Sequence, residues 1–320
     1  MTNRGTLGFS VGQITAAMLL ILLLQALSMS AQVVASDESR QGRGEIEAQF
    51  DVGDGRKMYL ECHGWGSPTV ILEAGFRNSS GIWHISDNAN QASVWDGVGT
   101  MTRVCAYDRP GTTLGAEKSS KSDPVPMPRT GPEIVHELHA LLRSAHVPGP
   151  YILVAHSLGG IFSRLYASAY PDSIIGLVLV DAFPENIAQL LGNRDGAIFL
   201  ELVVQVPDAF KDYKGLENVD LPELVQWMQN TAREKPLRPM PLVVLARGKP
   251  IALPKSLPDV FSEHLESAWR KGQLYLASLI PGSEFVVAGE SEHYIEVEQP
   301  ELVVDAVRRE LSAVRWGERH

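Results

Sequence analysis

Several short segments of this chain are apolar at almost every position, and amphipathic segments of helical length separate them. The clearest lie at residues 69–73, 103–107, 151–155 and 174–180. A strand that is apolar on both faces must be buried on both sides, which is typical of a parallel sheet between two layers of helices. The alternation therefore predicts an α/β fold with a mostly parallel sheet.

Further strands and helices extend this pattern. Residues 45–50 and 57–62 are strand-like and are joined through Asp54 and Gly55, a pair typical of hairpin turns, so we expect an antiparallel edge. Two more short strands are expected at residues 241–245 and 284–287. The segment TGPE at residues 130–133 is typical of a capping box with proline in the first helical turn. Helices are expected after this segment and at residues 159–169, 259–279 and 300–314.

The segment 183–239 interrupts the alternation. It is rich in short helical patches, at 198–204 and 221–231, and is too long for a plain connection between a strand and a helix. We interpret it as a helical cap inserted over the strand ends, between a first core part (45–182) and a second core part (240–320). Its apolar residues fit an acyl or alcohol pocket or simply the core of the cap; these are Phe199, Leu200, Val203, Phe210 and Trp227.

The N-terminal segment differs in kind from the rest. Residues 14–27 are almost wholly apolar, Arg4 precedes them, and small residues at 33–35 fit a signal peptide cleaved before Ser36. The alternative is an uncleaved anchor whose apolar stretch begins at Leu7. Both interpretations place the folded part outside the cytoplasm, as a secreted, periplasmic or anchored protein, with membrane association only through residues 7–27. Residues 36–44 are expected to be a linker.

The charge balance narrows the classes of partner. The chain has 28 Lys and Arg residues against 38 Asp and Glu residues, a net charge of −10, and no basic run. An acidic protein repels phosphate backbones, so we do not expect nucleic acid as a partner. The sequence HELH at residues 136–139 lacks the spacing of a zinc-binding HExxH motif, so no metal is expected. Oligomeric state is left open.

A serine stands where one buried strand ends. In YILVAHSLGG, residues 151–160, a strand runs into Ser157 and a helix follows. The strand–turn–helix arrangement is that of a nucleophile elbow, in which a tight turn exposes the serine hydroxyl at the carboxyl end of the sheet. The positions two before and two after the serine must be small, and here they are Ala155 and Gly159.

With this elbow, the chain resembles the α/β-hydrolase family from residue 45 to 320. The segments that carry the resemblance are VILEAGF, VCAYDRPG, VAHSLGG, GLVLVDA and SEHYIEVEQPELVVDAV. The resemblance implies an eight-stranded sheet flanked by helices, with catalytic residues in the order nucleophile, acid, histidine. It assigns the nucleophile to Ser157 and the base to His293, which follows the last strand. It also implies that the backbone N–H groups of Phe76 and Leu158 form an oxyanion hole.

The acid departs from the commonest family pattern. The usual position, after the strand at 241–245, reads LARGKPIALP and has no carboxylate. Some members carry the acid one strand earlier, which points to Asp181. Asp259, Glu73 and Asp108 are the alternatives, although for Asp108 we expect an ion pair with its neighbour Arg109.

The two cysteines, Cys62 and Cys105, are either a disulfide or two buried thiols. The strand order implied by the resemblance sets them on neighbouring strands, which favours the disulfide.

The expected activity is that of a serine hydrolase acting on a small-molecule ester or related acyl bond without a cofactor. The alternatives are an acyltransferase using the same residues, or a binding protein that kept the scaffold without the chemistry. A serine at the elbow argues against dehalogenase and epoxide hydrolase chemistry, which uses an aspartate there.

Overall fold

The computed structural model describes residues 45–115, 118–254 and 257–317. The expected leader at 1–35 and linker at 36–44 lie outside the described residues. The described part of the chain begins at the first strand of the sheet.

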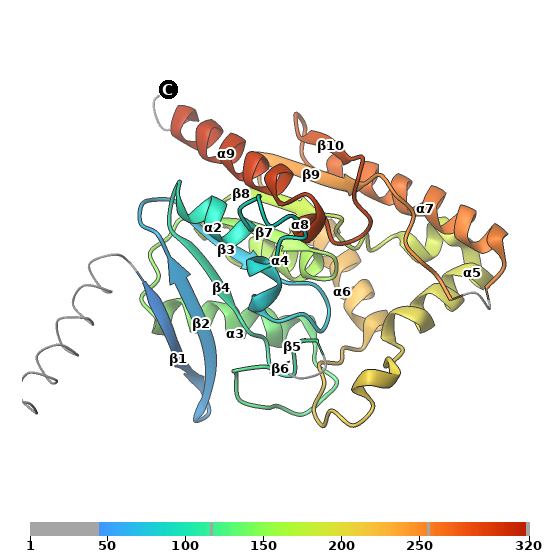
Figure 1. Ribbon diagram of the computed structural model, residues 1–320, viewed down its shortest axis with the longest axis horizontal. Helices are drawn as coiled ribbons and strands as arrows, with labels where there is room; N and C mark the ends of the chain where they lie inside the picture. The colour runs from blue at the N-terminus through green and yellow to red at the C-terminus, as the bar shows by residue number, and fades with distance from the viewer. Residues whose placement is uncertain (1–44, 116–117, 255–256, 318–320) are drawn as a thin grey trace, which may run out of the picture. The chain divides into compact units, whose positions relative to one another are not determined.

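Eight strands form one sheet in the order β1-β2-β4-β3-β7-β8-β9-β10 (Figure 1). β1 pairs antiparallel with β2, β2 pairs antiparallel with β4, and the remaining pairs are parallel. The strands are β1 (Ile46–Gly53), β2 (Arg56–His63), β3 (Thr69–Glu73), β4 (Val104–Tyr107), β7 (Tyr151–His156), β8 (Ile174–Val180), β9 (Leu242–Arg247) and β10 (Glu284–Ala288). The predicted mostly parallel sheet with an antiparallel hairpin at one edge is therefore confirmed. A separate ribbon pairs β5 (Thr113–Leu114) with β6 (Lys118–Ser119).

Helices cover both faces of the sheet, and the side chains of each central strand alternate between two hydrophobic clusters. On β7, Leu153 and Ala155 belong to one cluster, while Ile152 and Val154 belong to the other. The first cluster includes residues of α3 (Gly131–Ser144), α4 (Gly159–Ala169) and α7 (Asp259–Ala277). The second includes residues of η1 (Ser80–His84), α2 (Val94–Gly99), α8 (Ile295–Glu298) and α9 (Pro300–Gly317). Burial on both faces explains why these strands are apolar throughout.

The helix starts follow local sequence signals. The side chain of Thr130 accepts from the backbone N–H of Glu133, and the Glu133 carboxylate accepts from the backbone N–H of Thr130, so the predicted capping box is present. At the hairpin, Asp54 and Gly55 both have positive φ, 54° and 70°, as a tight two-residue turn requires.

The segment 183–239 is helical. It contains α5 (Ile187–Val204), η3 (Asp208–Phe210) and α6 (Leu221–Glu234), and another short turn, η2 (Pro171–Ser173), precedes β8. Gly192 interrupts α5 with a φ of 75° and a ψ of 172°, so α5 is two helical pieces joined at a kink. Val219 of this segment forms an isolated β-bridge with Arg129, which lies outside the segment. The expected helical patches therefore lie on α5 and α6.

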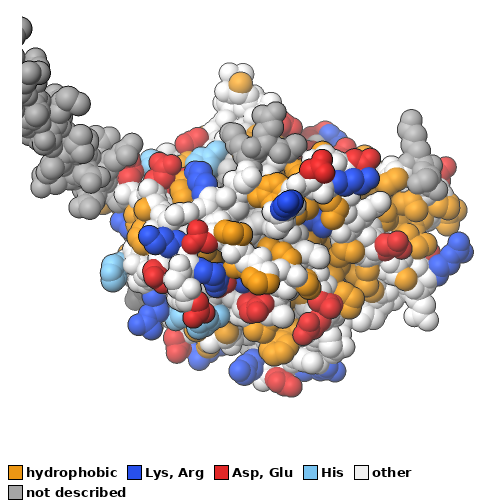
Figure 2. Space-filling view, turned by 90° about the horizontal axis from the view of Figure 1, so that it is seen from below, with side chains coloured by type: hydrophobic (Ala, Val, Ile, Leu, Met, Phe, Trp, Pro, Cys, Tyr) orange, Lys and Arg blue, Asp and Glu red, His pale blue; other side chains and the backbone are white. Residues whose placement is uncertain are grey.

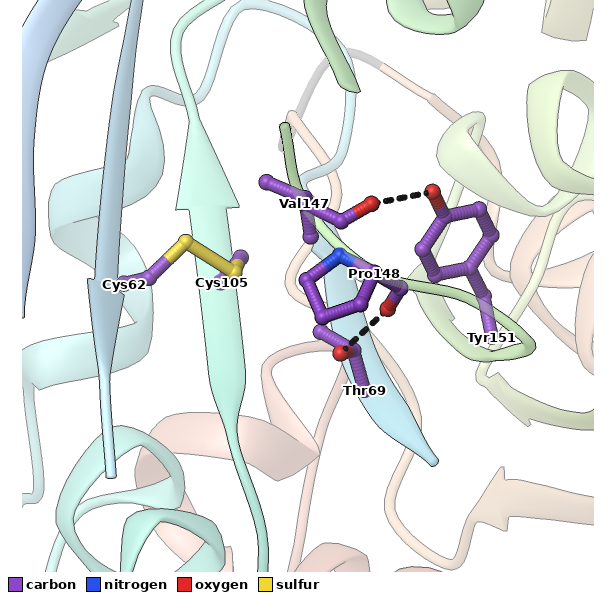
Figure 3. Close-up of a disulfide and its surroundings, with 6 residues drawn as sticks. All are labelled: Cys62, Thr69, Cys105, Val147, Pro148 and Tyr151. Carbon is purple, nitrogen blue, oxygen red and sulfur yellow. Dashed lines mark hydrogen bonds between the residues drawn. A yellow bond between two sulfur atoms is a disulfide. The ribbon is translucent and has the colours of Figure 1, made fainter. Parts of the chain in front are cut away.

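A disulfide joins Cys62 on β2 to Cys105 on β4 (Figure 3). The two residues are direct partners in the antiparallel β2–β4 pair, with Cα atoms 4.0 Å apart. On the other side of β4, Thr69 at the start of β3 donates a hydrogen bond to the carbonyl of Pro148, and Tyr151 donates to the carbonyl of Val147. The disulfide and these loop contacts tie the antiparallel edge and the start of β7 to the central strands.

The surface mixes charges of both signs. On the face shown in Figure 2, Lys and Arg side chains stand among Asp and Glu side chains, and apolar side chains lie between them. Across the residues that the structure describes, no helix has the length and apolar character needed to cross a membrane.

Candidate functional site

Ser157 lies on the sharp turn between β7 and α4. Its backbone is in the left-handed region, with a φ of 52°, which L-residues adopt rarely and usually at functional turns. A Cβ atom at Gly159 would lie 2.6 Å from the carbonyl oxygen of Ala74 and 2.8 Å from that of Glu73. The strand and helix backbones therefore approach too closely for any residue but glycine at this position. The local geometry is that of the elbow predicted from the sequence.

Two residues far from Ser157 in the chain complete a line of hydrogen bonds. His293, between β10 and α8, has Nε2 2.9 Å from the Oγ atom of Ser157. Its other ring nitrogen, Nδ1, lies 2.7 Å from Oδ2 of Asp181, which directly follows β8. Because β7 and β8 are adjacent parallel strands, Ser157 and Asp181 both lie at the carboxyl ends of the strands, next to each other. The structure thus brings together the three side chains that the sequence analysis named.

Asp181 is fully buried and surrounded by donors. Its Oδ1 accepts from the backbone N–H of Arg247 at 3.2 Å and from the indole N–H of Trp269 at 2.8 Å, and its Oδ2 accepts from the Arg247 guanidinium at 2.8 Å. Burial acts to raise the pKa of Asp181, but the His293 hydrogen bond and the Arg247 charge outweigh it and lower the pKa to about 2. Asp181 is therefore a carboxylate at any pH at which the protein works.

His293 has the opposite balance. Burial lowers its pKa below the usual value, and the positive charges of His156 and Arg247 act in the same direction, against the hydrogen bond and charge of Asp181. The ring is therefore neutral near neutral pH. A neutral imidazole whose Nδ1–H donates to Asp181 presents a lone pair on Nε2, which can accept the proton of Ser157.

The predicted oxyanion donors lie beside the serine. Phe76 and Leu158 both line the cavity at Ser157, and among the described residues their backbone N–H groups make no hydrogen bond. A Cβ atom at Gly75 would come within 2.7 Å of His156 Nδ1 and 3.2 Å of Ser157 Cβ, so the absence of a side chain at Gly75 lets this loop approach the serine. Two free N–H groups next to a nucleophile can bind a developing negative charge on oxygen.

The alternative acids have other partners. Asp259 is exposed at the start of α7. Glu73 pairs with Arg109. Asp108 accepts from the backbone N–H groups of Ser80 and Lys121 rather than pairing with Arg109, so the expected Asp108–Arg109 ion pair was wrong. The carboxylate of Asp108 instead links the segments that contain Ser80 and Lys121 through their backbone N–H groups.

Arg109 forms a buried network that the sequence did not reveal. Its guanidinium pairs with Glu73 on β3 and with Glu217 in the 183–239 segment, and it donates to the carbonyls of Ala74 and Gly75. Glu217 also accepts from the backbone N–H of Arg77 at 2.6 Å. Burial raises the pKa of Glu73 to about 6, because desolvation outweighs the nearby Arg109 charge. The network fixes the loop that carries Phe76.

Arg109→Met is expected to lower the free energy of unfolding by about 3–5 kcal/mol, because it removes the guanidinium that pairs with the buried carboxylates of Glu73 and Glu217. Urea unfolding followed by circular dichroism measures the change. Arg238→Met is the matched control: Arg238 pairs with Asp172 on the surface and should matter by less than about 1 kcal/mol. Equal stability of Arg109→Met and wild type would mean that the network contributes nothing to the fold.

A cavity of about 200 Å³ opens onto the Oγ atom of Ser157 and the ring of His293. Its walls are mostly apolar and come from the elbow, from the segment after β8, from α5 and from α7. The lining side chains other than those already described include Phe183, Phe199, Val203, Ile251 and Tyr294. Phe199 and Val203 are the two of the five cap residues named from the sequence that reach the cavity. Trp227 is instead exposed on α6.

The HELH segment has structural contacts. Glu137 pairs with Arg56 and Arg129, and the ring of His139 stacks on that of Tyr170 with centroids 3.8 Å apart. His136 is exposed on α3, while His139 is half-buried against Tyr170.

Comparison with known proteins agrees with this architecture. A model of the alpha/beta hydrolase family matches residues 62–306. The uncharacterized protein YqjL of Bacillus subtilis is 28% identical over 235 residues, 73% of this chain and 80% of that protein. The putative carbamate hydrolase RutD of Yersinia enterocolitica is 32% identical over 130 residues, 40% of this chain and 41% of its own length. A thermophilic esterase from Thermogutta terrifontis shares the fold, with a TM-score of 0.51 and 20% identity over 84% of this chain and 98% of that one.

The family model begins near the end of β2 and ends in α9, so the elbow and the strands from β3 to β10 lie within it, while β1 and most of β2 precede it. The chain belongs to the alpha/beta hydrolase family.

Proposed function

We propose that this protein is a serine hydrolase that cleaves a carboxylic ester or a related acyl bond, with Ser157 as nucleophile, His293 as general base and Asp181 as the acid. The observation that carries the proposal is the line of hydrogen bonds from Ser157 through His293 to Asp181, at 2.9 and 2.7 Å. A nucleophile within hydrogen-bonding reach of a base, which a third group orients, is the arrangement that acyl transfer needs.

In the proposed mechanism, Nε2 of His293 accepts the proton of Ser157 as Oγ attacks the substrate carbonyl. The negative charge that develops on the carbonyl oxygen is bound by the N–H groups of Phe76 and Leu158, each contributing about 3 kcal/mol of barrier lowering. His293 then delivers the proton to the leaving group, and an acyl group remains on Ser157. Water, activated by the same imidazole, hydrolyses this acyl-enzyme.

Asp181 acts through His293. Its carboxylate holds Nδ1–H, which fixes the tautomer in which Nε2 carries the lone pair, and it offsets the positive charge that forms on the ring. Arg247 and Trp269 in turn hold the carboxylate of Asp181. The acid is thereby kept ionised and correctly oriented.

A fluorophosphonate probe tests the proposal, because such probes react with activated serine hydroxyls. We expect the wild-type protein to be labelled at Ser157 and Ser157→Ala to be unlabelled, as read by peptide mass spectrometry. Ser262→Ala, at the entrance of a different cavity, should be labelled like the wild type. A folded wild-type protein that resists the probe would contradict the proposal and favour a binding protein on the same scaffold.

A further inference from the structure

The cavity at Ser157 is small for an enzyme site. At about 200 Å³ it falls below the range of roughly 300–1,000 Å³ typical of sites for drug-sized ligands. An engineered apolar cavity of about 150 Å³ in another protein holds one benzene molecule. The volume here therefore suits a single ring or a short chain. The acyl group must fit this space, because it stays bonded to Ser157 after the alcohol leaves.

Three aromatic side chains from different elements set this size. Phe183 follows β8, Phe199 lies on α5 and Trp269 lies on α7, and each is at most 6% exposed. Their ring centroids are 5.9–6.2 Å apart. The indole of Trp269 is fixed by its hydrogen bond to Asp181 and by the Arg247 guanidinium over its ring. Because the three rings come from different elements and pack against one another, the other two oppose the rotation of any one ring that would lengthen the cavity.

The cavity also lacks a free partner for a charged acyl group. Arg247 and His156 line it, but the Arg247 guanidinium already pairs with Asp181 and Glu266, and His156 faces Glu296. A carboxylate on the acyl chain would lose its hydration without gaining an available cation among the lining residues that the structure describes.

We propose that the substrates are esters of compact, uncharged acyl groups, either a chain of up to about six carbons or a single aromatic ring, with Phe199 and Trp269 as the residues that limit length. This inference rests on the proposed function.

The test uses p-nitrophenyl esters that share one leaving group and differ in the acyl group: acetate, butyrate, hexanoate, decanoate and benzoate. We expect kcat/KM to be highest between butyrate and hexanoate or for benzoate, and to fall for decanoate by about tenfold or more. Phe199→Ala should raise kcat/KM for decanoate relative to butyrate by about tenfold. Phe210→Ala, in the same segment but away from this cavity, should leave the profile unchanged.

The wild-type profile decides the question even if Phe199→Ala fails to fold. A protein that the fluorophosphonate labels but that prefers decanoate, or that hydrolyses none of these esters, overturns the size limit. An unlabelled protein overturns the proposed function itself.

A second, independent observation concerns His156, the residue before Ser157. Its ring is 1% exposed, and its Nε2 lies 3.0 Å from the backbone carbonyl oxygen of His293, to which it can donate. Its Nδ1 lies 3.0 Å from Oε1 of Glu296, which is fully buried on α8. When His156 is protonated, the two groups form a buried ion pair in which the charges offset each other.

We infer that His156 and Glu296 are positioning residues that hold the backbone of His293 against the nucleophile turn. His156 is bonded directly to Ser157 and binds the carbonyl of His293, while Glu296, three residues after His293, anchors the start of α8 to the same ring. The hydrogen bond from His156, the residue next to Ser157, to the carbonyl of His293 thus sets the distance between His293 Nε2 and Ser157 Oγ.

The charge of this pair reaches the base. The groups that face His293 are Asp181, Arg247 and His156, and the groups that face His156 are Glu296, His293 and Asp181. Burial lowers the pKa of His156, but the carboxylate of Glu296 outweighs burial and raises it, and positive charge on His156 lowers the pKa of His293. Without Glu296, the pKa of His156 falls, less positive charge faces His293, and the pKa of His293 rises.

Glu296→Gln tests this role. We expect kcat to fall by about 10–100-fold with little change in KM, because a misplaced base affects the transition state. The acidic limb of the pH profile of kcat/KM should move to higher pH. Glu290→Gln, exposed in the loop between β10 and α8, should leave both unchanged.

The double variant His156→Gln/Glu296→Gln leaves no unpaired buried charge and should show the same shift of the acidic limb. Wild-type kcat and an unshifted limb in both variants would overturn the positioning role. If the variants lose thermal stability but the acidic limb of the pH profile does not move, the His156–Glu296 pair stabilises the fold and does not position His293.

Discussion

Replacement of Ser157 by alanine is expected to lower kcat for p-nitrophenyl butyrate by about 10⁴- to 10⁶-fold, and His293→Ala by a similar factor. In the proposed mechanism Ser157 provides the attacking oxygen, and its Oγ atom lies in the cavity 2.9 Å from Nε2 of His293. Single-turnover and steady-state rates with purified variants measure the loss. Circular dichroism and thermal unfolding should match the wild type, because the alanine removes one partly exposed hydroxyl.

The double variant Ser157→Ala/His293→Ala separates a joint role from two independent ones. If the two side chains act as one unit, the double variant is no slower than either single variant. Losses that multiply would mean that His293 serves a different step. Substantial turnover in Ser157→Ala would exclude the covalent mechanism.

Much of the fold was predictable because the core is periodic. β3 and β8 begin and end where the runs at 69–73 and 174–180 begin and end, since strands buried on both faces consist mainly of apolar residues. The buried Glu73 at the end of β3 is the exception, and it pairs with Arg109. α4 likewise matches residues 159–169. The short α2 and α8 were not expected, since four to six residues are too few for a helical period to show.

The residues of the site that stand at the ends of strands were predictable from the sequence. The ion-pair partners that hold those residues were not. The line Ser157–His293–Asp181 follows from strand ends that share one edge of the sheet. Arg247 ends β9 within the very segment that lacks a carboxylate, LARGKP, and its role as the partner of Asp181 was missed. The available signal was the cation at the position where the family resemblance implies an acid, because a buried aspartate on the neighbouring strand needs a counter-charge.

The same limit explains the error at Arg109. Sequence adjacency favoured Asp108 as its partner, but neighbouring side chains diverge, and the buried guanidinium instead reaches Glu73 on β3 and Glu217 more than a hundred residues later. Such pairings are created by tertiary packing, and no local pattern encodes them.

Asp181→Asn is expected to lower kcat by about 10⁴-fold with little change in KM. The asparagine keeps the size of the side chain, but it lacks the charge that offsets the protonated His293 and can turn an N–H toward Nδ1, which favours the tautomer without a lone pair on Nε2. Because the pKa of Asp181 is about 2, the acid is ionised across the working range, so its own titration does not contribute to the pH profile above about pH 4. In the proposed mechanism, we expect the acidic limb above that pH to reflect protonation of His293.

Asp259→Asn is the control for this prediction, because Asp259 was the alternative acid and lies exposed at the start of α7. It should retain wild-type kcat. Arg247 keeps Glu266 as a partner in Asp181→Asn, so the variant does not leave the guanidinium without a counter-charge and should fold. A folded Asp181→Asn enzyme with nearly normal turnover, together with a slow Asp259→Asn enzyme, would move the acid to α7 and would mean that the 2.7 Å contact between Asp181 and His293 does not govern catalysis.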